Sequence, residues 1–257
     1  MRVEVQVREH GYAPHRHDTY TFALTLEGVQ CFNYRETRQH SLPGGVVVLH
    51  PDELHDGFAG TDDGFLYRAI SLDPALIQSA LGGKPLPFIH NGISTDARLL
   101  RALRPLLDDY KHSLDAMQFQ DAVYGLATTL RDMTCPARPH KRPDIVAAER
   151  ARQYLIAHWN AAVSMEDLEH ETGRNRWKLS RDFRTLYGTS PYRYLTMRRL
   201  ERARVLIQQG HAPAGVAVTC RFADQSHLIR QFRKAFGVTP SHWAASFRAG
   251  PGCTIVL

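Results

Sequence analysis

The 257-residue sequence has little cysteine and no long apolar run. The four cysteines, Cys31, Cys135, Cys220 and Cys253, form no Cys-x-x-Cys pair, so their spacing indicates neither a zinc module nor a disulfide framework. No apolar stretch approaches the roughly 20 residues that a membrane-spanning helix needs, and the N-terminus carries charges where a signal peptide is apolar. We therefore expect a cytoplasmic protein with reduced thiols and no membrane partner.

Charge is distributed unevenly along the chain. Residues 1–140 hold 13 Lys and Arg against 17 Asp and Glu, whereas residues 141–257 hold 19 against 9. An acidic half joined to a basic half is typical of a protein in which only one domain approaches a polyanion. Length and charge together predict two domains, the second binding nucleic acid, although a solvated basic surface without a partner would give the same charge balance.

Short strand-like segments occupy the first third of the sequence. Val3, Val5 and Val7 alternate with polar residues, which is the period of a half-buried strand. Further β-branched or aromatic runs cover Tyr20 to Leu26, Val29 to Tyr34, Gly45 to Leu49 and Phe65 to Leu72, separated by Gly28, by Pro43-Gly44-Gly45 and by Gly57 to Gly64. Many short strands at this spacing indicate a sandwich or a barrel.

Helical periodicity replaces this pattern after Pro74. Leucines recur at three- and four-residue intervals from Leu99 to Leu107, and a second helix is predicted from Ser113 to Met133. Two such helices either cap the β-domain or form a dimer seam. We expect a homodimer through the region from Asp96 to Met133, with Leu103 on an exposed apolar stripe. Three prolines and a basic run mark residues 135–143 as a linker.

The basic half contains a divergent internal repeat at an offset of 49 residues. One copy reads Leu-Ser-Arg-Asp-Phe-Arg from Leu179 to Arg184 and continues to Pro191; the other reads Leu-Ile-Arg-Gln-Phe-Arg from Leu228 to Arg233 and continues to Pro240. A short helix candidate precedes each copy, from Ser164 to Thr172 and from Pro213 to Cys220. This order predicts two helix-turn-helix motifs within residues 144–249, followed by a tail at 250–257.

The second helix of such a motif enters the major groove, where Arg and Gln side chains read guanine and adenine edges. The two candidates, Asn175 to Tyr187 and the helix around Phe232, each combine one apolar stripe with a basic polar face. Between them, Ser190-Pro191 opens a helix that Gly210 closes. Its roughly 20 residues span about 30 Å, close to the roughly 34 Å of one DNA turn.

Residues 144–249 resemble the DNA-binding domain of the AraC/XylS transcriptional regulators, whose second half typically reads Gly-Phe-x-x-x-Ser-x-Phe-x-Arg-x-Phe-Arg-x-x-Phe-Gly-x-Ser/Thr-Pro. This chain matches from Arg221-Phe222 through Ser226, Arg230 and Phe232-Arg233 to Phe236-Gly237 and Thr239-Pro240. The resemblance implies base contacts at Trp177, Ser180, Arg181, Gln225, Ser226, His227 and Arg230. We expect phosphate contacts from Lys178, Arg184, Arg233 and Lys234.

Two positions depart from that family pattern. Arg221 stands where a glycine is usual in the second turn, and Glu169 stands where the first motif usually has a small alanine. A turn that favours positive φ would be strained by about 1 kcal/mol with Arg at this position. We therefore expect the second motif to dock on DNA less well than the first.

Histidines form the candidate site of the N-terminal domain. His15 and His17 would leave the same face of a strand, and His55 follows Pro51-Asp-Glu-Leu. With Gly28 and Gly45, this pattern resembles the cupin barrel that AraC-type regulators carry as an effector domain. We expect an effector pocket lined by His15, His17, Tyr20 and His55.

The same three histidines, His15, His17 and His55, could instead bind a transition metal, or could be hydrogen-bonded structural residues. Metal-binding cupins place a Glu four or five positions beyond the second His, where this chain has Thr21 and Phe22. The expectation is therefore a metal-free pocket without a cofactor.

These patterns predict an α+β multidomain protein. Residues 1–134 would form a cupin-like β-barrel with two helices, and residues 144–249 an all-α double helix-turn-helix domain. The predicted function is a sequence-specific regulator, not an enzyme, that binds double-stranded promoter DNA and a small-molecule effector. The alternatives are a cupin-type metal enzyme, such as a dioxygenase or isomerase, and an architectural DNA-binding protein with an inert N-terminal domain.

Overall fold

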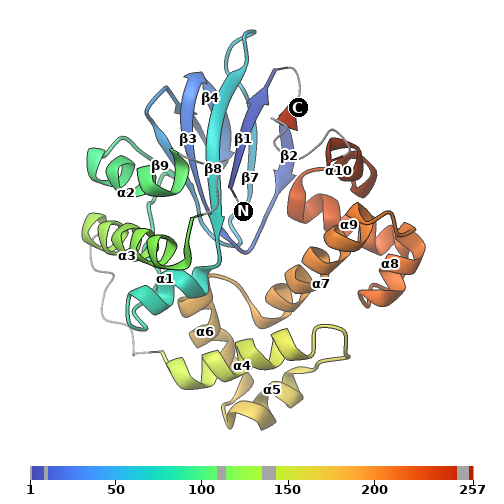
Figure 1. Cartoon of the computed structure of the whole chain (residues 1–257). Coiled ribbons are helices and arrows are strands. Elements are labelled where there is room, and N and C mark those ends of the chain that lie inside the picture. Colours follow the sequence, from blue (N-terminus) through green and yellow to red (C-terminus); the bar gives the residue numbers. More distant parts are fainter. Residues whose placement is uncertain (1, 9–10, 109–113, 135–142, 248–254, 257) are drawn as a thin grey trace.

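The computed structural model of the protein describes residues 2–8, 11–108, 114–134, 143–247 and 255–256. Its N-terminal half contains two packed sheets (Figure 1). The larger sheet has the strand order β10 (Ile255–Val256), β1 (Arg2–Val7), β8 (Phe65–Leu72), β3 (Tyr20–Gly28), β6 (Val46–Leu49) and β9 (Ile93–Ser94). The smaller sheet has the order β2 (Tyr12–His15), β7 (His55–Ala59), β4 (Gln30–Tyr34) and β5 (Thr37–Ser41).

The two sheets form a sandwich and do not close into the barrel that the sequence predicted, so this part of the predicted fold is wrong. Within the described residues no strand pairing joins one sheet to the other. Strand β1 pairs with β8 on one side and with β10 on the other, so its free edge is taken by β10 and not by β2. The chain passes between the sheets at Gly28, which has a φ of +70°, and a Cβ there would lie 2.1 Å from the Gly64 carbonyl oxygen.

Strands β5 and β7 were not predicted from the sequence. We expected Gly57 to Gly64 to separate two strands, but β7 extends through Gly57 to Ala59 and pairs with both β2 and β4. The sequences of β5 and β7, Thr-Arg-Gln-His-Ser and His-Asp-Gly-Phe-Ala, are mostly polar or small. Tertiary pairing, not local propensity, therefore makes these segments strands.

Three helices cover the outer face of the larger sheet: α1 (Pro74–Ala80), α2 (Ala97–Leu107) and α3 (Ala116–Met133) (Figure 1). Asp73, Asp96 and Asp115 cap their N-termini through side-chain hydrogen bonds. Leu103, predicted to lie on an exposed stripe, is instead fully buried. The leucine stripe of α2 packs against the sheet and α3, so α2 caps the β-domain.

The C-terminal half is helical and contains α4 (Ile145–Ala157), α5 (Met165–Thr172), α6 (Arg176–Tyr187), α7 (Pro191–Gln208), α8 (Pro213–Thr219), α9 (Gln225–Phe236) and α10 (Pro240–Phe247). Helices α5 with α6 and α8 with α9 are the two predicted helix-turn-helix pairs. Each pair has its own apolar core, and α7 contributes residues to both. The N-cap Ser190 and Pro191 begin α7 as expected. Its 18 residues give it a length of about 27 Å.

The segments predicted as linker and tail lie almost wholly outside the described residues. Helix α3 ends at Met133 and Asp144 caps α4, so residues 135–142 run between these two helices. Of the predicted tail, only β10 is described, and it pairs in parallel with β1. No helix in the described part of the chain is long and apolar enough to cross a membrane.

Candidate functional site

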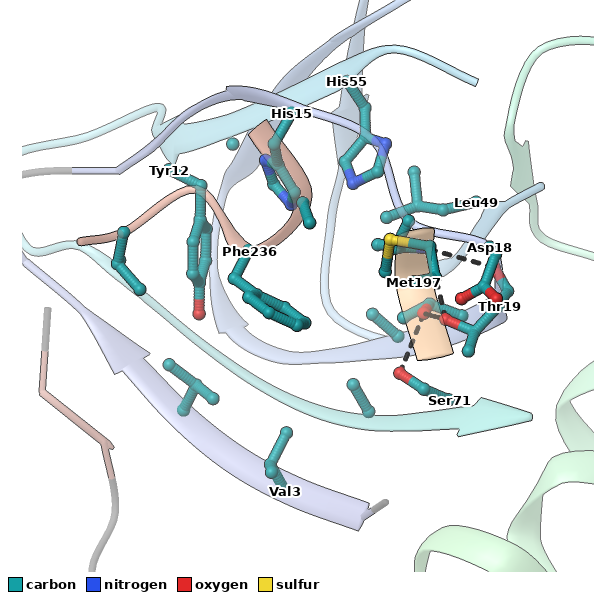
Figure 2. Close-up of a pocket in the computed structure, with 18 of the residues that line it drawn as sticks. Val3, Tyr12, His15, Asp18, Thr19, Leu49, His55, Ser71, Met197 and Phe236 are labelled. Carbon is teal, nitrogen blue, oxygen red and sulfur yellow. Dashed lines mark hydrogen bonds between the residues drawn. The ribbon is translucent and has the colours of Figure 1, made fainter. Parts of the chain in front are cut away.

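A cavity of about 460 Å³ lies between the β-sandwich and the C-terminal helices (Figure 2). One wall comes from β1, β3, β8 and the β2–β7 edge, and includes Val3, Ala69 and Ser71. The opposite wall comes from α7, α9 and α10, and includes Met197 and Phe236. Most of the lining surface is apolar. The cavity therefore belongs to both halves of the protein, and the sequence pattern of neither half could reveal it.

Three of the four residues expected in the effector pocket line this cavity: His15, His17 and His55. Tyr20 does not, and its assignment to the pocket is corrected. Side chains alternate along β3, so Thr21 and Ala23 face the cavity, whereas Tyr20 faces the core beneath the helices. There its hydroxyl donates to the Pro87 carbonyl oxygen.

Polar and charged side chains, among them Asp56, Glu201 and Arg204, also line the cavity, and two pairs of hydroxyl groups lie on its wall. The hydroxyl groups of Tyr12 and Tyr67 lie 2.7 Å apart, and burial raises the pKa of Tyr12 to about 12, so the pair is neutral. Thr21 Oγ1 lies 2.9 Å from Ser71 Oγ on neighbouring strands. The cavity thus offers a few hydroxyl groups on an apolar surface, as small-molecule sites usually do.

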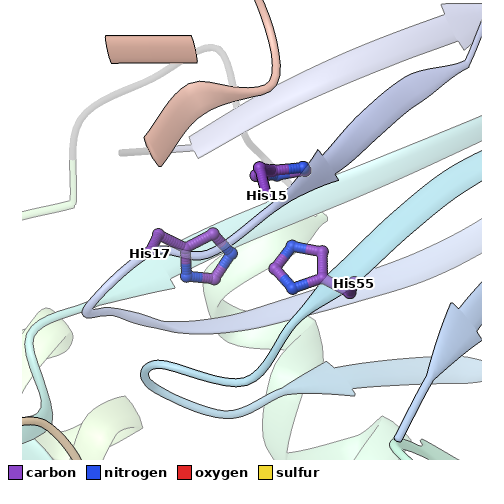
Figure 3. Close-up of side chains that lie close together, drawn as sticks. All are labelled: His15, His17 and His55. Atoms are coloured by element: carbon purple, nitrogen blue, oxygen red, sulfur yellow. The ribbon is translucent and has the colours of Figure 1, made fainter. Parts of the chain in front are cut away.

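The three histidines meet at one edge of the cavity (Figure 3). Strand β2 ends at His15, so His17 lies just beyond the strand, but its ring still turns toward the other two. Ring centroids lie 4.3 Å apart for His15 and His55 and 4.7 Å apart for His17 and His55. Burial lowers the pKa of all three, to about 3 for His17, so the imidazoles are neutral at pH 7.

Ion pairs and a backbone hydrogen bond fasten the two halves together beside the cavity. Asp18 pairs with Arg198 of α7 at 2.7 Å, and Asp52 pairs with Arg193 of α7 at 2.5 Å. The Arg16 amide donates to the carbonyl oxygen of Lys234 in α9 at 2.8 Å. Sequence reasoning missed these contacts because their members lie far apart in the chain and belong to no motif.

Helix α6 presents the residues expected to touch DNA at the first motif. Trp177 is 75% exposed, Lys178, Arg181 and Arg184 are exposed, and Ser180 is half-buried. The opposite stripe, with Leu179 and Phe183, is fully buried. The reading face is therefore open to solvent, and the assignment of base and phosphate contacts on α6 stays a prediction.

Helix α9 presents the second set, of which Gln225, Ser226, Arg230, Arg233 and Lys234 are exposed. The expected reader His227 is half-buried: its Nδ1 accepts from the Ala223 amide at 3.3 Å and its ring lies against Phe222. Its ring is thus partly used to hold the turn before α9. The DNA-contact assignments on this helix also stay a prediction.

The two departures from the family pattern have distinct structural outcomes. Arg221 adopts a φ of +61°, so the predicted left-handed conformation is confirmed. Glu169 accepts a hydrogen bond from the Arg176 amide at 2.7 Å and pairs with the Arg176 guanidinium at 2.6 Å. Glu169 therefore caps the start of the first reading helix, where a carboxylate also interacts favourably with the helix dipole.

Comparisons with known proteins agree with this arrangement. Residues 1–127 match the AraC-like ligand binding domain family, and residues 168–246 match a helix-turn-helix domain family. The HTH-type transcriptional regulator YbfI of Bacillus subtilis is 24% identical over 83% of this chain and 80% of that protein. The HTH-type transcriptional activator RhaS of Yersinia pestis is 23% identical over 93% of this chain and 92% of that protein.

Among solved structures, ToxT from Vibrio cholerae superposes with a TM-score of 0.68 at 12% identity, over 95% of this chain and 97% of that one. This likeness concerns the fold. Taken with the two family matches, the fold and the site define a DNA-binding transcriptional regulator with a ligand-binding domain. The chain belongs to the AraC family of these regulators, as its basic repeat predicted.

Proposed function

We propose that this regulator binds its effector in the cavity between the two domains and that occupancy changes how α9 meets DNA. One observation carries the proposal: the cavity wall is shared between the ligand-binding domain and helices α7, α9 and α10. A molecule bound there touches both domains at once. It can therefore favour one domain arrangement over another, which is the differential binding that regulation requires.

The second helix-turn-helix motif is the expected target of this control. Phe236, the last residue of α9, lies in the cavity, and the carbonyl oxygen of Lys234 is bonded to the N-terminal domain. Helix α6 contacts α1 and lines no part of the cavity. Effector binding should therefore change DNA contacts made by α9 more than those made by α6.

The cavity wall points to the effector's chemistry. About 460 Å³ lies within the roughly 300–1,000 Å³ usual for small-molecule sites. Mostly apolar walls with the Tyr12–Tyr67 and Thr21–Ser71 hydroxyl groups suit a compact molecule with an apolar body and a few hydrogen-bonding groups. ToxT has been solved with an unsaturated fatty acid bound, which makes such a fatty acid a reasonable first probe.

DNA recognition and assembly complete the proposal. Bases would be read by Trp177, Ser180 and Arg181 on α6 and by Gln225, Ser226, His227 and Arg230 on α9. The nearby basic side chains would neutralise phosphates. Two copies would pair through α3, so that four reading helices engage one promoter in the cytoplasm. The curated relatives are transcriptional regulators, and an enzyme would have no use for two basic reading helices.

The experiment uses the full-length protein and promoter fragments from its own gene and its neighbours. Footprinting should show sequence-selective binding that weakens steeply with salt. A thermal-shift panel of small molecules, including an unsaturated fatty acid, should contain a stabilising compound that also changes the footprint under α9. Ala69→Phe, which fills the cavity, should abolish both effects and keep basal DNA binding. Ala97→Phe, at an exposed position of α2, should abolish neither effect. An unchanged ligand response in Ala69→Phe would place the effector elsewhere.

A further inference from the structure

The hydrogen bonds of the three cavity histidines fix which ring nitrogen carries the proton. The Nδ1 atoms of His15, His17 and His55 lie 2.8, 3.0 and 3.0 Å from the backbone carbonyl oxygens of Ala13, Thr19 and Glu53. A carbonyl oxygen can only accept, so each Nδ1 carries the hydrogen. Each Nε2 therefore has a free lone pair, because neutral imidazole has one N–H group.

At least one of these lone pairs has no use within the protein. The Nε2 atom of His55 is buried and has no hydrogen-bond partner. Buried polar atoms are nearly always paired, so an orphaned imidazole nitrogen beside two other histidines calls for an explanation. A purely structural role for His55 would have been met by its bond to the Glu53 carbonyl oxygen alone.

We propose that His15, His17 and His55 bind one transition-metal ion of the zinc or cobalt type through their Nε2 atoms. Imidazole nitrogens suit these ions, and ligand histidines commonly donate their other N–H to a backbone carbonyl, as all three do here. The fourth position of a tetrahedral site would be open toward the cavity, since the chain offers no carboxylate at the position where metal-binding cupins have one.

The spacing of the cluster fits this assignment. Potential ligand atoms of the three histidines lie within 4.8 Å of one another. In a tetrahedral site with metal–nitrogen distances of about 2.1 Å, ligand nitrogens are about 3.4 Å apart, so small side-chain rotations close the site. Asp56 also lines the cavity and acts electrostatically on His15, so it provides negative charge near the ion.

Metal binding would also act on the second reading helix. Gly237 ends α9 so close to the cluster that a Cβ on it would lie 3.2 Å from His15 Nδ1. The residue after His15, Arg16, donates its amide hydrogen to the Lys234 carbonyl oxygen in the last turn of α9. Fixing His15 and His17 on one ion would therefore fix the strand end on which α9 rests. This inference is independent of the organic effector proposed above.

Cobalt titration of the full-length, chelator-treated protein tests the proposal. One equivalent of Co²⁺ should produce the visible absorption of a tetrahedral site, displaceable by Zn²⁺, and should raise the melting temperature because metal binds only the folded site. Changing a residue that hydrogen-bonds to a metal ligand lowers metal affinity by about 10- to 100-fold. Removing a ligand itself, in His15→Gln, His17→Gln or His55→Gln, should therefore lower Co²⁺ affinity by at least as much. His211→Gln, at an exposed histidine, is the matched control.

Histidine ¹⁵N NMR of the unmutated protein provides a readout that does not depend on the variants folding. Zn²⁺ should shift the Nε2 resonances of three histidines and leave their Nδ1 atoms protonated. The proposal is overturned if the protein takes up no stoichiometric Co²⁺, if other histidines carry the shifted resonances, or if His55→Gln folds and binds Co²⁺ as tightly as the unmutated protein. Failure to bind metal would not contradict the proposed effector cavity, because the Ala69→Phe experiment tests that cavity separately.

Discussion

Asp18 Oδ2 lies 2.7 Å from Arg198 Nη2, and these two residues are 180 positions apart in the chain. Asp18 is buried just before β3, and Arg198 projects from the middle of α7. Burial raises the pKa of Asp18, and the Arg198 guanidinium opposes this shift by favouring the charged carboxylate. The pair therefore links the ligand-binding domain to the helix that joins the two reading motifs.

Breaking this pair should loosen the contact between the domains. Asp18→Asn leaves the Arg198 charge without its counterion, which we expect to weaken domain docking by about 1–3 kcal/mol. Hydrogen exchange followed by mass spectrometry should show faster exchange in β2 and α9. Asp132→Asn breaks an exposed pair with Arg131 and should leave exchange there unchanged. Equal protection in both variants would show that the Asp18 pair does not hold the domains.

The motifs of the DNA-binding half could be predicted from the sequence, but the cavity could not. Capping residues such as Ser164 and Asn175, together with the apolar stripes, define the two helices of the first motif within a few consecutive residues. The cavity depends on non-local contacts: Phe236 and Ser71 line it together, and no local pattern relates them. Tyr20 was misplaced for the same reason, because only the order of the layers shows which face of β3 meets the cavity.

Base reading and phosphate binding can be separated on the two reading helices. Arg181→Ala should lose about 1–3 kcal/mol of binding free energy on the cognate site and relax the sequence preference of the protein, because an Arg that reads a base edge is lost. Lys234→Ala should weaken binding to cognate and random DNA alike. It should also reduce the slope of log affinity against log salt concentration by about one. Fluorescence anisotropy across a salt series measures both, with exposed Arg101→Ala on α2 as the control. Equal losses on both DNAs for Arg181→Ala would contradict its assignment as a reader.

The dimer surface is expected on α3. Met117 and Tyr124 are 81% and 57% exposed and lie seven residues apart, so they share one face of that helix. The double change Met117→Glu with Tyr124→Arg should give a folded monomer in sedimentation velocity. Leu103→Arg should instead unfold the N-terminal domain, because it places a charge in a fully buried core position. If the double variant still forms a dimer, the interface does not lie on this face of α3.

The buried histidines should make the protein less stable in mild acid. The pKa of His17 is about 3 in the folded protein against an ordinary value of 6.5, and burial is the main cause. Between these values the unfolded chain binds a proton that the folded chain does not, so stability falls as pH drops below 6.5. Each such histidine contributes up to about 1.4 kcal/mol per pH unit in this range.

Urea unfolding of the chelator-treated protein at pH 7.5 and 5.5 measures this effect without a contribution from metal. His17→Gln should lose less stability between the two pH values than the unmutated protein does, by up to about 1.4 kcal/mol, because one buried imidazole no longer titrates on unfolding. Exposed His211→Gln should lose as much as the unmutated protein. Carboxylates do not account for the difference, because the variant and the unmutated protein share all of them, including Asp18, whose pKa is raised by burial, and Glu149, whose pKa is lowered to about 2. An identical pH dependence for His17→Gln and the unmutated protein would mean that His17 is solvated enough to protonate in the folded state.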